Sequence, residues 1–172
     1  VGALEACNRL PALASAEPVG RRIADAWCGL ADAFSLAGEW AKQAESDLKC
    51  GDAYVAAGYL SLASNRYTAT ASTLMQHGEH EKALSAAQMA AKAATTKRDA
   101  MQALLMQSAA LEKLGRGAEQ REVFSNAIGF AQSEDDWNKL LADARMVMDD
   151  SIHAAVFRAA NGWAAGRTSS SP

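Results

Sequence analysis

Histidines and acidic residues around Gly78 come nearest to a metal-binding pattern in this chain. His80 and Glu81 begin the His-Glu-x-x-His sequence of zinc proteases, but the position of the second histidine holds Leu84. One histidine cannot form that site, because the zinc needs both imidazoles from one helix face. His77 leaves two interpretations: a weak metal site across the turn, or solvated turn residues, which the sequence favours. We therefore predict no metal site and no cofactor.

The remaining ionisable side chains do not form a catalytic set. Asp149 and Asp150 are adjacent in sequence, as are the three acidic residues at 134–136. Adjacent carboxylates of this kind are typical of helix ends, where they interact with the helix dipole. His153 has no nucleophile or carboxylate at a pairing distance in the pattern, and the chain contains no GxxxxGK(S/T), GxSxG or GxGxxG motif. We predict that this chain is not an enzyme.

The chain contains three cysteines, Cys7, Cys28 and Cys50. They form no CxxC pair and lie in apolar segments, where a thiol packs as a small hydrophobic group. We therefore expect all three to be reduced. The sequence also has no Asn-x-Ser/Thr glycosylation site and no basic segment followed by an apolar one at its start. These features together predict a cytoplasmic protein.

The charge and the hydropathy of the chain argue against nucleic-acid binding and against a membrane span. The net charge is −3, whereas nucleic-acid-binding domains usually carry a strong basic excess. The least charged stretch, residues 53–78, carries one basic residue, is rich in Ser, Thr, Asn and Gln, and is interrupted by Gly58. It does not fit a membrane span. We therefore expect a protein or peptide partner, no nucleic acid and no membrane span, and the sequence assigns no oligomeric state.

The composition predicts an all-α fold. Alanine accounts for 40 of the 172 residues, aromatic residues for 6%, and no proline occurs between residues 19 and 171. Alanine has the highest helix propensity, and the residues that favour strands are scarce. Gly38, Gly78 and Gly115 each follow an apolar-periodic run, at spacings of 40 and 37 residues. A glycine at such a place is typical of a helix end, and the spacing is typical of repeated helical hairpins.

The residues before each of these glycines follow one rule. Counting back by four, seven and eleven residues gives a large, a small and a large side chain. Residues at this spacing share a helix face, and the small one lets a neighbouring helix approach closely. The three sets are Trp27, Ala31 and Phe34; Tyr67, Ala71 and Leu74; and Leu104, Ser108 and Leu111.

This register resembles the tetratricopeptide repeat (TPR), whose first helix carries a large, a small and a large residue before the turn. The matching residues of the second helices are Ala83, Ala90, Phe124 and Ala127. The period exceeds the usual 34 residues and no proline closes a unit, which is more similar to longer-helix relatives such as the SNAP-like adaptors of vesicle fusion. The resemblance implies antiparallel helical hairpins stacked as a short, right-handed α-solenoid.

These patterns divide the chain into four parts. Three TPR-like hairpins cover residues 19–132. Residues 1–18 are either a leader or the remnant of a preceding helix, and residues 166–172 are predicted to be disordered. Residues 133–165 are predicted to form a C-terminal capping helix or helices. The hairpin helices are expected at residues 19–37, 39–57, 59–77, 79–95, 97–114 and 117–131.

The predicted cap carries an apolar stripe from Trp137 to Trp163. It is either one helix of about 27 residues or two helices that meet near residues 149–151. A terminal unit outside the repeat pattern is suited to covering the last open face of an array. The alternative is that its far end docks a partner, because Ile152, Val156 and Phe157 are many apolar residues for a chain terminus.

A concave groove is expected along the first helices, one residue beyond each core position. Its surface would be neutral and partly apolar, which suits an amphipathic helix or an extended peptide. Where some TPR domains place Lys, Asn and Arg to bind a terminal carboxylate, this sequence has Thr68 with Ser72 and Leu105 with Ala109, which disfavours a carboxylate clamp. Met75 and Leu105 fit burial against neighbouring helices equally well. The candidate groove residues are Asp32, Ser35, Asn65, Thr68, Ser72, Met75, Leu105 and Glu112.

The sequence therefore favours a non-catalytic interaction module, acting as a scaffold or adaptor that binds a partner in this groove. The alternatives are a regulatory sensor for a small peptide or metabolite, a SNAP-like vesicle-fusion adaptor, and an enzyme domain with an unrecognised all-helical site.

Overall fold

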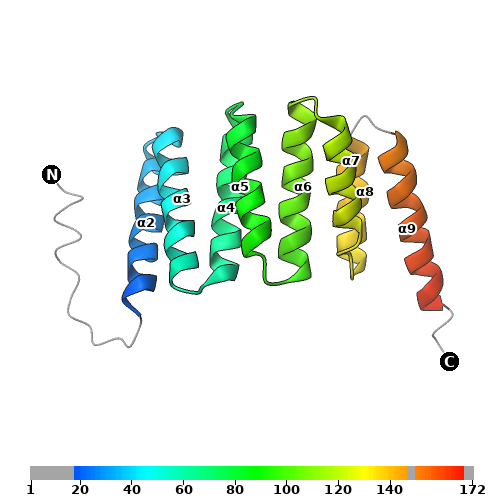
Figure 1. Cartoon of the computed structure of the whole chain (residues 1–172), viewed down its shortest axis with the longest axis horizontal. Coiled ribbons are helices and arrows are strands. Elements are labelled where there is room, and N and C mark those ends of the chain that lie inside the picture. The colour runs from blue at the N-terminus through cyan, green and yellow to red at the C-terminus, as the bar shows by residue number, and fades with distance from the viewer. Residues whose placement is uncertain (1–17, 147–149, 169–172) are drawn as a thin grey trace.

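The computed structural model describes residues 18–146 and 150–168, and in these ranges every regular element is an α-helix (Figure 1). The six hairpin helices agree with the expected ranges to within three residues at each end. The helices are α2 (Val19–Leu36), α3 (Trp40–Ala56), α4 (Leu60–Gln76), α5 (His80–Ala93), α6 (Lys97–Lys113), α7 (Gly117–Ile128), α8 (Glu134–Met146) and α9 (Asp150–Thr168).

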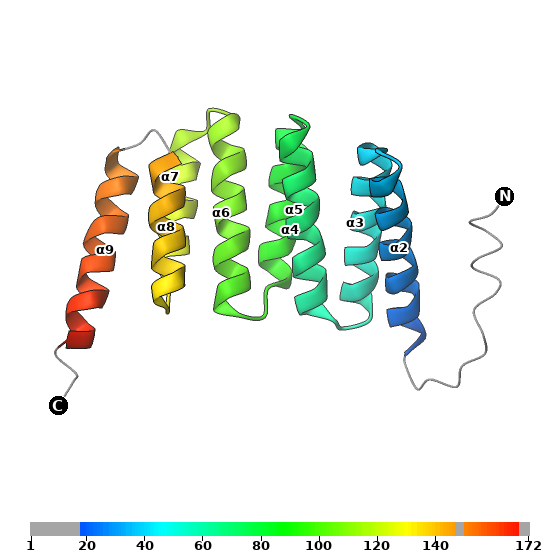
Figure 2. The same cartoon turned by 180° about the vertical axis from the view of Figure 1, so that it is seen from behind.

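Successive helices pack against each other as a stack of hairpins. Helix α2 packs on α3, α4 on α5, and α6 on α7, and each of the first two hairpins also packs on the next through α3–α4 and α5–α6. Views from opposite sides place α2, α4, α6 and α8 in one layer and α3, α5 and α7 in the other (Figures 1 and 2). The expected all-α hairpin arrangement is confirmed at this level.

One turn geometry ends four of the helices. After α2, Gly38 adopts φ of 73°, its amide donates to the Ser35 carbonyl, and the Glu39 amide donates to the Phe34 carbonyl. These two hydrogen bonds form a Schellman motif. This motif needs one residue in the left-handed backbone conformation, which glycine adopts without steric cost. Gly58, which the repeat register did not include, forms the same turn between α3 and α4. The four left-handed glycines are Gly38, Gly58, Gly78 and Gly115.

Small side chains form the contacts between helices. The small residues of the register are nearly or fully buried, and so are the alanines of the second helices. A methyl side chain lets two backbones approach closely while leaving no cavity, which explains why alanine is abundant here. These buried small residues are Ala31, Ala71, Ser108, Ala83, Ala90 and Ala127.

The C-terminal region forms two helices rather than one. Trp137 and Leu140 of α8 and Ile152 and Val156 of α9 join one apolar cluster with residues of α6 and α7. Helix α9 continues to Thr168, three residues into the stretch that we expected to be disordered. The rest of that tail and residues 1–17 of the expected leader or helix remnant lie outside the described residues.

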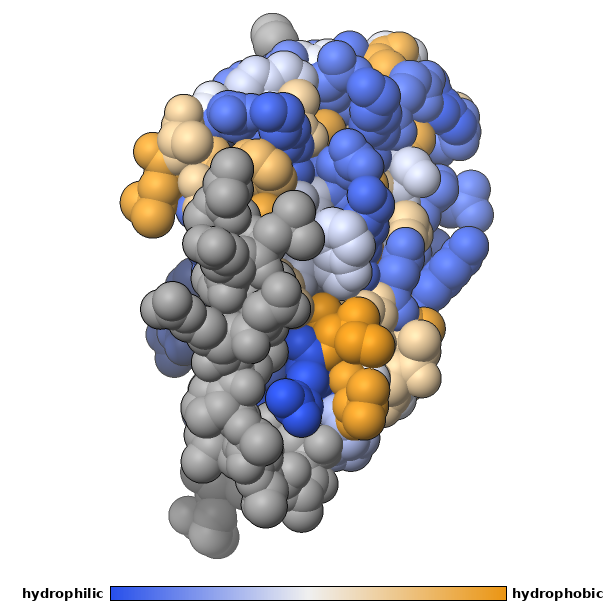
Figure 3. Space-filling model, turned by 90° about the vertical axis from the view of Figure 1, so that its left-hand side faces the viewer, coloured by the Kyte–Doolittle hydropathy of each residue, from blue (hydrophilic) through white to orange (hydrophobic). Residues whose placement is uncertain are grey.

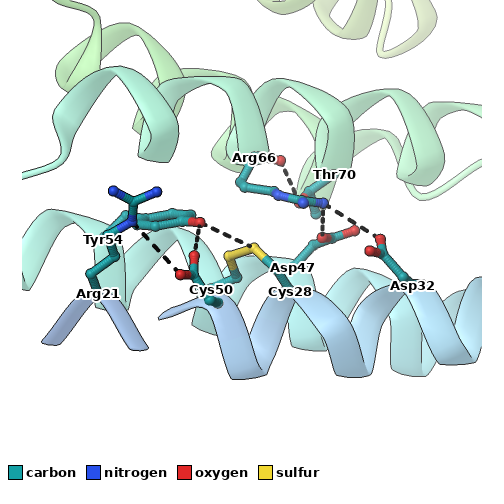
Figure 4. The surroundings of a disulfide bond; sticks show 9 residues. Arg21, Cys28, Asp32, Asp47, Cys50, Tyr54, Arg66 and Thr70 are labelled. Carbon is teal, nitrogen blue, oxygen red and sulfur yellow. Dashed lines mark hydrogen bonds and ion pairs between the residues drawn. A yellow bond between two sulfur atoms is a disulfide. The ribbon is translucent and has the colours of Figure 1, made fainter. Parts of the chain in front are cut away.

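The expectation of reduced cysteines is wrong for two of the three. Cys28 of α2 and Cys50 of α3 form a disulfide bond, with their Cα atoms 5.3 Å apart (Figure 4). The two residues lie ten before and twelve after the turn at Gly38, so antiparallel packing of the hairpin brings them to the same level. Cys7 lies outside the described residues. Apolar surroundings therefore did not indicate a free thiol, because they also fit a buried disulfide.

Removal of this bond should destabilise the first hairpin. The bridged cysteines are 22 residues apart, and a loop of that size restricts the unfolded chain by about 3 kcal/mol. We expect Cys28→Ala/Cys50→Ala to lower the free energy of unfolding by about that amount in urea titrations. Alkylation of denatured, unreduced protein should label one thiol. Labelling of all three would contradict the bond.

The contact between Gly51 of α3 and Tyr67 of α4 provides a second stability prediction. A Cβ added at Gly51 would lie 2.8 Å from two ring carbons of Tyr67, whose hydroxyl donates to the Asp52 carboxylate at 2.6 Å. The anchored ring cannot move aside, so Gly51→Ala should destabilise the fold by about 1–3 kcal/mol in chemical denaturation. The control is Gly162→Ala in α9, where an added Cβ meets no neighbour within 4 Å. Equal stability of the two variants would contradict the close contact.

Candidate functional site

A cavity of about 250 Å³ lies between α4, α6 and α8, with one wall from α7. Its apolar surface comes from Leu105, Met106 and Ala109 of α6 and from Phe124 of α7. Thr68 of α4 borders it on one side, and α8 supplies polar groups on the other. The helices of one layer therefore form a hollow with an apolar floor and polar edges, which is the general composition of a ligand or peptide site.

Helix α6 positions most of the floor. Leu105 lies three and four residues before Ser108 and Ala109, and Glu112 lies four and three residues after them, so all four share one face of the helix. Leu105 is only 7% exposed and joins the apolar cluster beneath the cavity, whereas Glu112 remains half-buried at its edge. The same helix therefore supplies both the apolar base and an acidic rim.

Ser108 is the unusual polar group of this floor. It is 1% exposed, lines the cavity, and its hydroxyl has no hydrogen-bond partner among the described residues. The hydroxyl of Thr68 already donates to the Ser64 carbonyl at 2.9 Å. Buried polar groups normally have partners, and an unpartnered one is unfavourable. Ser108 is therefore the group in this cavity that gains most from a hydrogen bond to a bound molecule.

The charged rim is mixed in sign. Lys139 and Asp143 of α8 form an ion pair at 3.5 Å, both partly exposed. Glu112 of α6 makes no ion pair with the described residues. Two carboxylates and one ammonium group leave the rim with an acidic excess, so the unpaired Glu112 favours a donor or a positive charge on a bound segment.

Side-chain hydrogen bonds cap the start of α8, the helix that carries Lys139 and Asp143. Ser133 Oγ accepts a hydrogen bond from the Asp136 amide, and the Asp136 carboxylate accepts from the amides of Gln132 and Ser133, each at 3.0 Å. This reciprocal pattern is a capping box. The hydrogen bond from the Gln132 amide is the largest of the interactions that hold the pKa of Asp136 below its usual value. The acidic residues at 134–136 thus lie at a helix end, as their adjacency in the sequence predicted.

The structure brings together three of the eight predicted groove residues, Thr68, Leu105 and Glu112, in this cavity. The other five do not line it. Asp32, Ser35 and Asn65 are exposed, Ser72 is half-buried, and Met75 packs partly against an apolar cluster. Met75 and Leu105 thus pack against neighbouring helices, which was the alternative to a place in the groove. Leu105 also reaches the cavity.

Several cavity residues were absent from the predicted groove. Ser108 was assigned to the helix contact, and Phe124 to the second-helix core. Lys139 and Asp143 come from the segment interpreted as a cap, and their i, i+4 spacing was the only signal that they share a face. Gln102 and Met106 had no signal that distinguished them from other helical residues.

Asp32 belongs to a polar cluster that joins the first three helices instead. The Arg66 guanidinium of α4 lies 3.7 Å from the Asp32 carboxylate of α2 and 3.3 Å from that of Asp47 on α3 (Figure 4). Asp47 is 3% exposed, and burial is the main cause that raises its pKa, partly offset by Arg66. All these groups have partners, so we interpret the cluster as structural.

A second hollow, of about 390 Å³, lies in the other layer between α3 and α5. Trp40, Leu48 and Met89 give it an apolar lining. Its charged residues already have partners on their own helices or turns, because Glu45 pairs with Lys49 and Lys82 with Glu79. Among the described residues that line it, none has an unpartnered buried polar group, so the cavity at Ser108 is the better candidate site.

The histidines at the turn do not lie in a metal-type cluster. The His77 ring stacks on Trp40, with ring centroids 4.2 Å apart. Within residues 18–146 and 150–168, no three His, Cys, Asp or Glu side chains are grouped for a metal ion. In the same ranges, no helix combines the length and apolar character needed to cross a membrane.

Comparison with known proteins adds no relative. The chain matches no protein-family model, no curated protein sequence and no solved structure.

The capping box of α8 predicts a pH-dependent contribution to stability. We expect Asp136→Ala to lower the free energy of unfolding by about 1 kcal/mol at neutral pH, because the variant loses the cap. The folded pKa of Asp136 is below its usual value of about 4, so the wild-type advantage is complete above that value. It should shrink as the pH falls through the lower folded pKa, as urea titrations at neutral and acidic pH will measure. A difference in the free energy of unfolding between wild type and variant that widens in acid would contradict the role of Asp136 as a cap.

Proposed function

We propose that this chain is a non-catalytic interaction module that binds a helix or an extended segment of a partner protein in the groove at Ser108. The observation that carries this proposal is the cavity that α4, α6 and α8 share, in which Thr68, Leu105 and Glu112 meet. A scaffold or adaptor role follows from a groove of this kind in a stack of hairpins. No enzymatic activity and no nucleic-acid binding belong to the proposal.

The proposed architecture is a TPR-like, right-handed α-solenoid. It is supported by the buried small residues at equivalent register positions and by the repeated glycine turn. Packing of α8 and α9 against α6 and α7 supports the proposal that they cap the array. A SNAP-like vesicle-fusion adaptor stays a more specific hypothesis, which rests on the length of the repeat.

The chemistry of the groove suggests what the partner segment carries. Leu105, Ala109 and Phe124 favour one or two apolar side chains in the hollow. Glu112 favours a basic residue beside them, and Ser108 favours a backbone or side-chain hydrogen bond. The proposed ligand is thus an amphipathic segment with an apolar anchor and an adjacent positive charge.

A small-molecule or short-peptide sensor is the second candidate. The cavity volume of about 250 Å³ is close to the lower end of ligand pockets, which is about 300 Å³. The buried, unpartnered Ser108 hydroxyl also suits a small polar ligand. In this function the groove would control stability or assembly through occupancy rather than by joining two proteins.

The proposed cytoplasmic location now has an observation against it. Disulfides are rare in reducing compartments, and the Cys28–Cys50 bond is buried between α2 and α3. The missing glycosylation site favours the cytoplasm, and the disulfide favours an oxidising compartment. The thiol-labelling measurement described above, applied to protein from its native source, decides between them.

Selection of peptides from a display library tests the groove directly. We expect selected peptides to bind wild-type protein and to lose at least about tenfold in affinity with Ala109→Glu, which places a charge on the floor. Ala118→Glu, at an exposed site on α7, is the matched control and should bind normally. Circular dichroism of both variants verifies that the fold is retained.

The outcomes separate the two candidate functions. Peptides that bind both variants equally well would place the interface elsewhere and contradict the groove. The sensor would be favoured if no peptide can be selected, but a thermal-shift screen of metabolites finds a ligand that stabilises the wild type. Ala109→Glu should then abolish this stabilisation. Failure of both screens would contradict the proposed site.

A further inference from the structure

The outer face of α2 is an exposed apolar surface. Val19 is 71% exposed and Ile23 is 51% exposed, and they lie opposite the buried face formed by Ala24, Cys28 and Ala31. Figure 3 views the molecule from the side on which α2 lies and shows apolar side chains open there. Exposed residues of this size gathered along one helix face are typical of an interaction surface.

The spacing of this face is that of a coiled-coil seam. Apolar residues recur along α2 at alternating intervals of four and three residues, which is the a/d pattern of helices that pack side by side. All of them are exposed except Leu30, which is half-buried. We call this set, five residues of α2 and its C-cap residue, the α2 seam: Val19, Ile23, Ala26, Leu30, Ala33 and Ala37.

The α2 seam is complementary to itself. If a second α2 is placed antiparallel, with a two-fold axis beside residue 28, every large residue faces an alanine. Alternating large and small residues across a helix contact is the arrangement that fills space between two helices. The facing pairs are Val19 with Ala37, Ile23 with Ala33, and Leu30 with Ala26.

Gly29 supplies an independent observation at the same place. It is exposed in the middle of α2, and a Cβ added to it would meet no heavy atom within 4 Å. Glycine is unfavourable inside a helix, and no contact within the described residues requires it at this position. Beside the two-fold axis, however, a glycine lets two helix backbones approach closely.

We propose that the α2 seam is an interface with a second copy of this chain, formed by antiparallel packing of the two α2 helices about a two-fold axis at the level of residue 28, next to Gly29. Self-complementarity is what a two-fold, isologous interface requires, because the same patch serves both partners. An unrelated partner would not need the large and small residues to be distributed symmetrically about residue 28. The groove at Ser108 lies between α4, α6 and α8, so both copies keep it free.

The size of the seam sets the strength of the dimer. Helix α2 has 18 residues, which corresponds to about 27 Å of contact. A single helix pair of that length buries less than the standard interface of about 1,200–2,000 Å². The dimer should therefore be reversible and should form with rising protein concentration.

Sedimentation of the full chain over a range of concentrations tests the proposal. We expect a monomer–dimer equilibrium, and we expect Ala26→Glu to weaken it at least about tenfold by placing a carboxylate opposite Leu30. The matched control, Ala118→Glu, should dimerise like the wild type. Because Ala26 is exposed, Ala26→Glu should keep the helicity and the melting temperature that the wild type has at concentrations where both are monomeric.

Cross-linking locates the axis. In a Cys7→Ser background, Gly29→Cys should form covalent dimers under mild oxidation, because the two new thiols face each other. Gly162→Cys, at a similarly open helical site, should not. A monomer at all concentrations up to about 1 mM, or a dimer that neither change affects, would overturn the proposal. A melting temperature of Ala26→Glu below that of the wild type, at a concentration where both are monomeric, would also overturn it, since the seam would then be covered by the chain itself.

Discussion

Close approach of helices through small side chains is the constraint on which this structure depends. Ala71, Ala83 and Ala90 are fully buried at contacts between successive helices, where a larger residue would separate the backbones. The same constraint places Ser108 at a close contact of α6. This close packing of helices determines how the hairpins stack in two layers. It also determines where the hollow between α4, α6 and α8 lies.

A core made of alanine requires additional interactions. Burying a methyl group contributes about 0.8 kcal/mol, less than half of what a buried leucine contributes. The first hairpins supplement this with the Cys28–Cys50 bond and with a hydrogen bond from Tyr54 to the Asp25 carboxylate at 2.5 Å. Arg66 joins three helices by binding carboxylates on two of them. Polar and covalent links thus stabilise the contacts that small residues make possible.

The candidate surfaces arise where this close packing stops. Ser108 has the small volume that the helix contact needs, but its hydroxyl has no partner among the described residues, so the floor of the groove keeps an unused polar group. On α2 no described helix packs against the outer face, and the a/d pattern of Ile23 and Leu30 remains exposed or half-exposed. Both sites combine a small residue with a surface that no described helix covers. The groove at Ser108 is the proposed site for a peptide segment, and the outer face of α2 is the proposed site for a second copy.

The sequence by itself determined the helices and their turns, because helix propensity, apolar spacing and glycine signals such as Gly38 act over a few neighbouring residues. The groove was predicted only in part: Leu105 could be placed by its register, whereas Lys139 reaches the cavity from α8, two helices further along the chain. The pairing of Cys28 with Cys50 also needed the tertiary structure, since it depends on how two antiparallel helices align. Local interactions decided the elements, and only their packing in space decided which side chains meet.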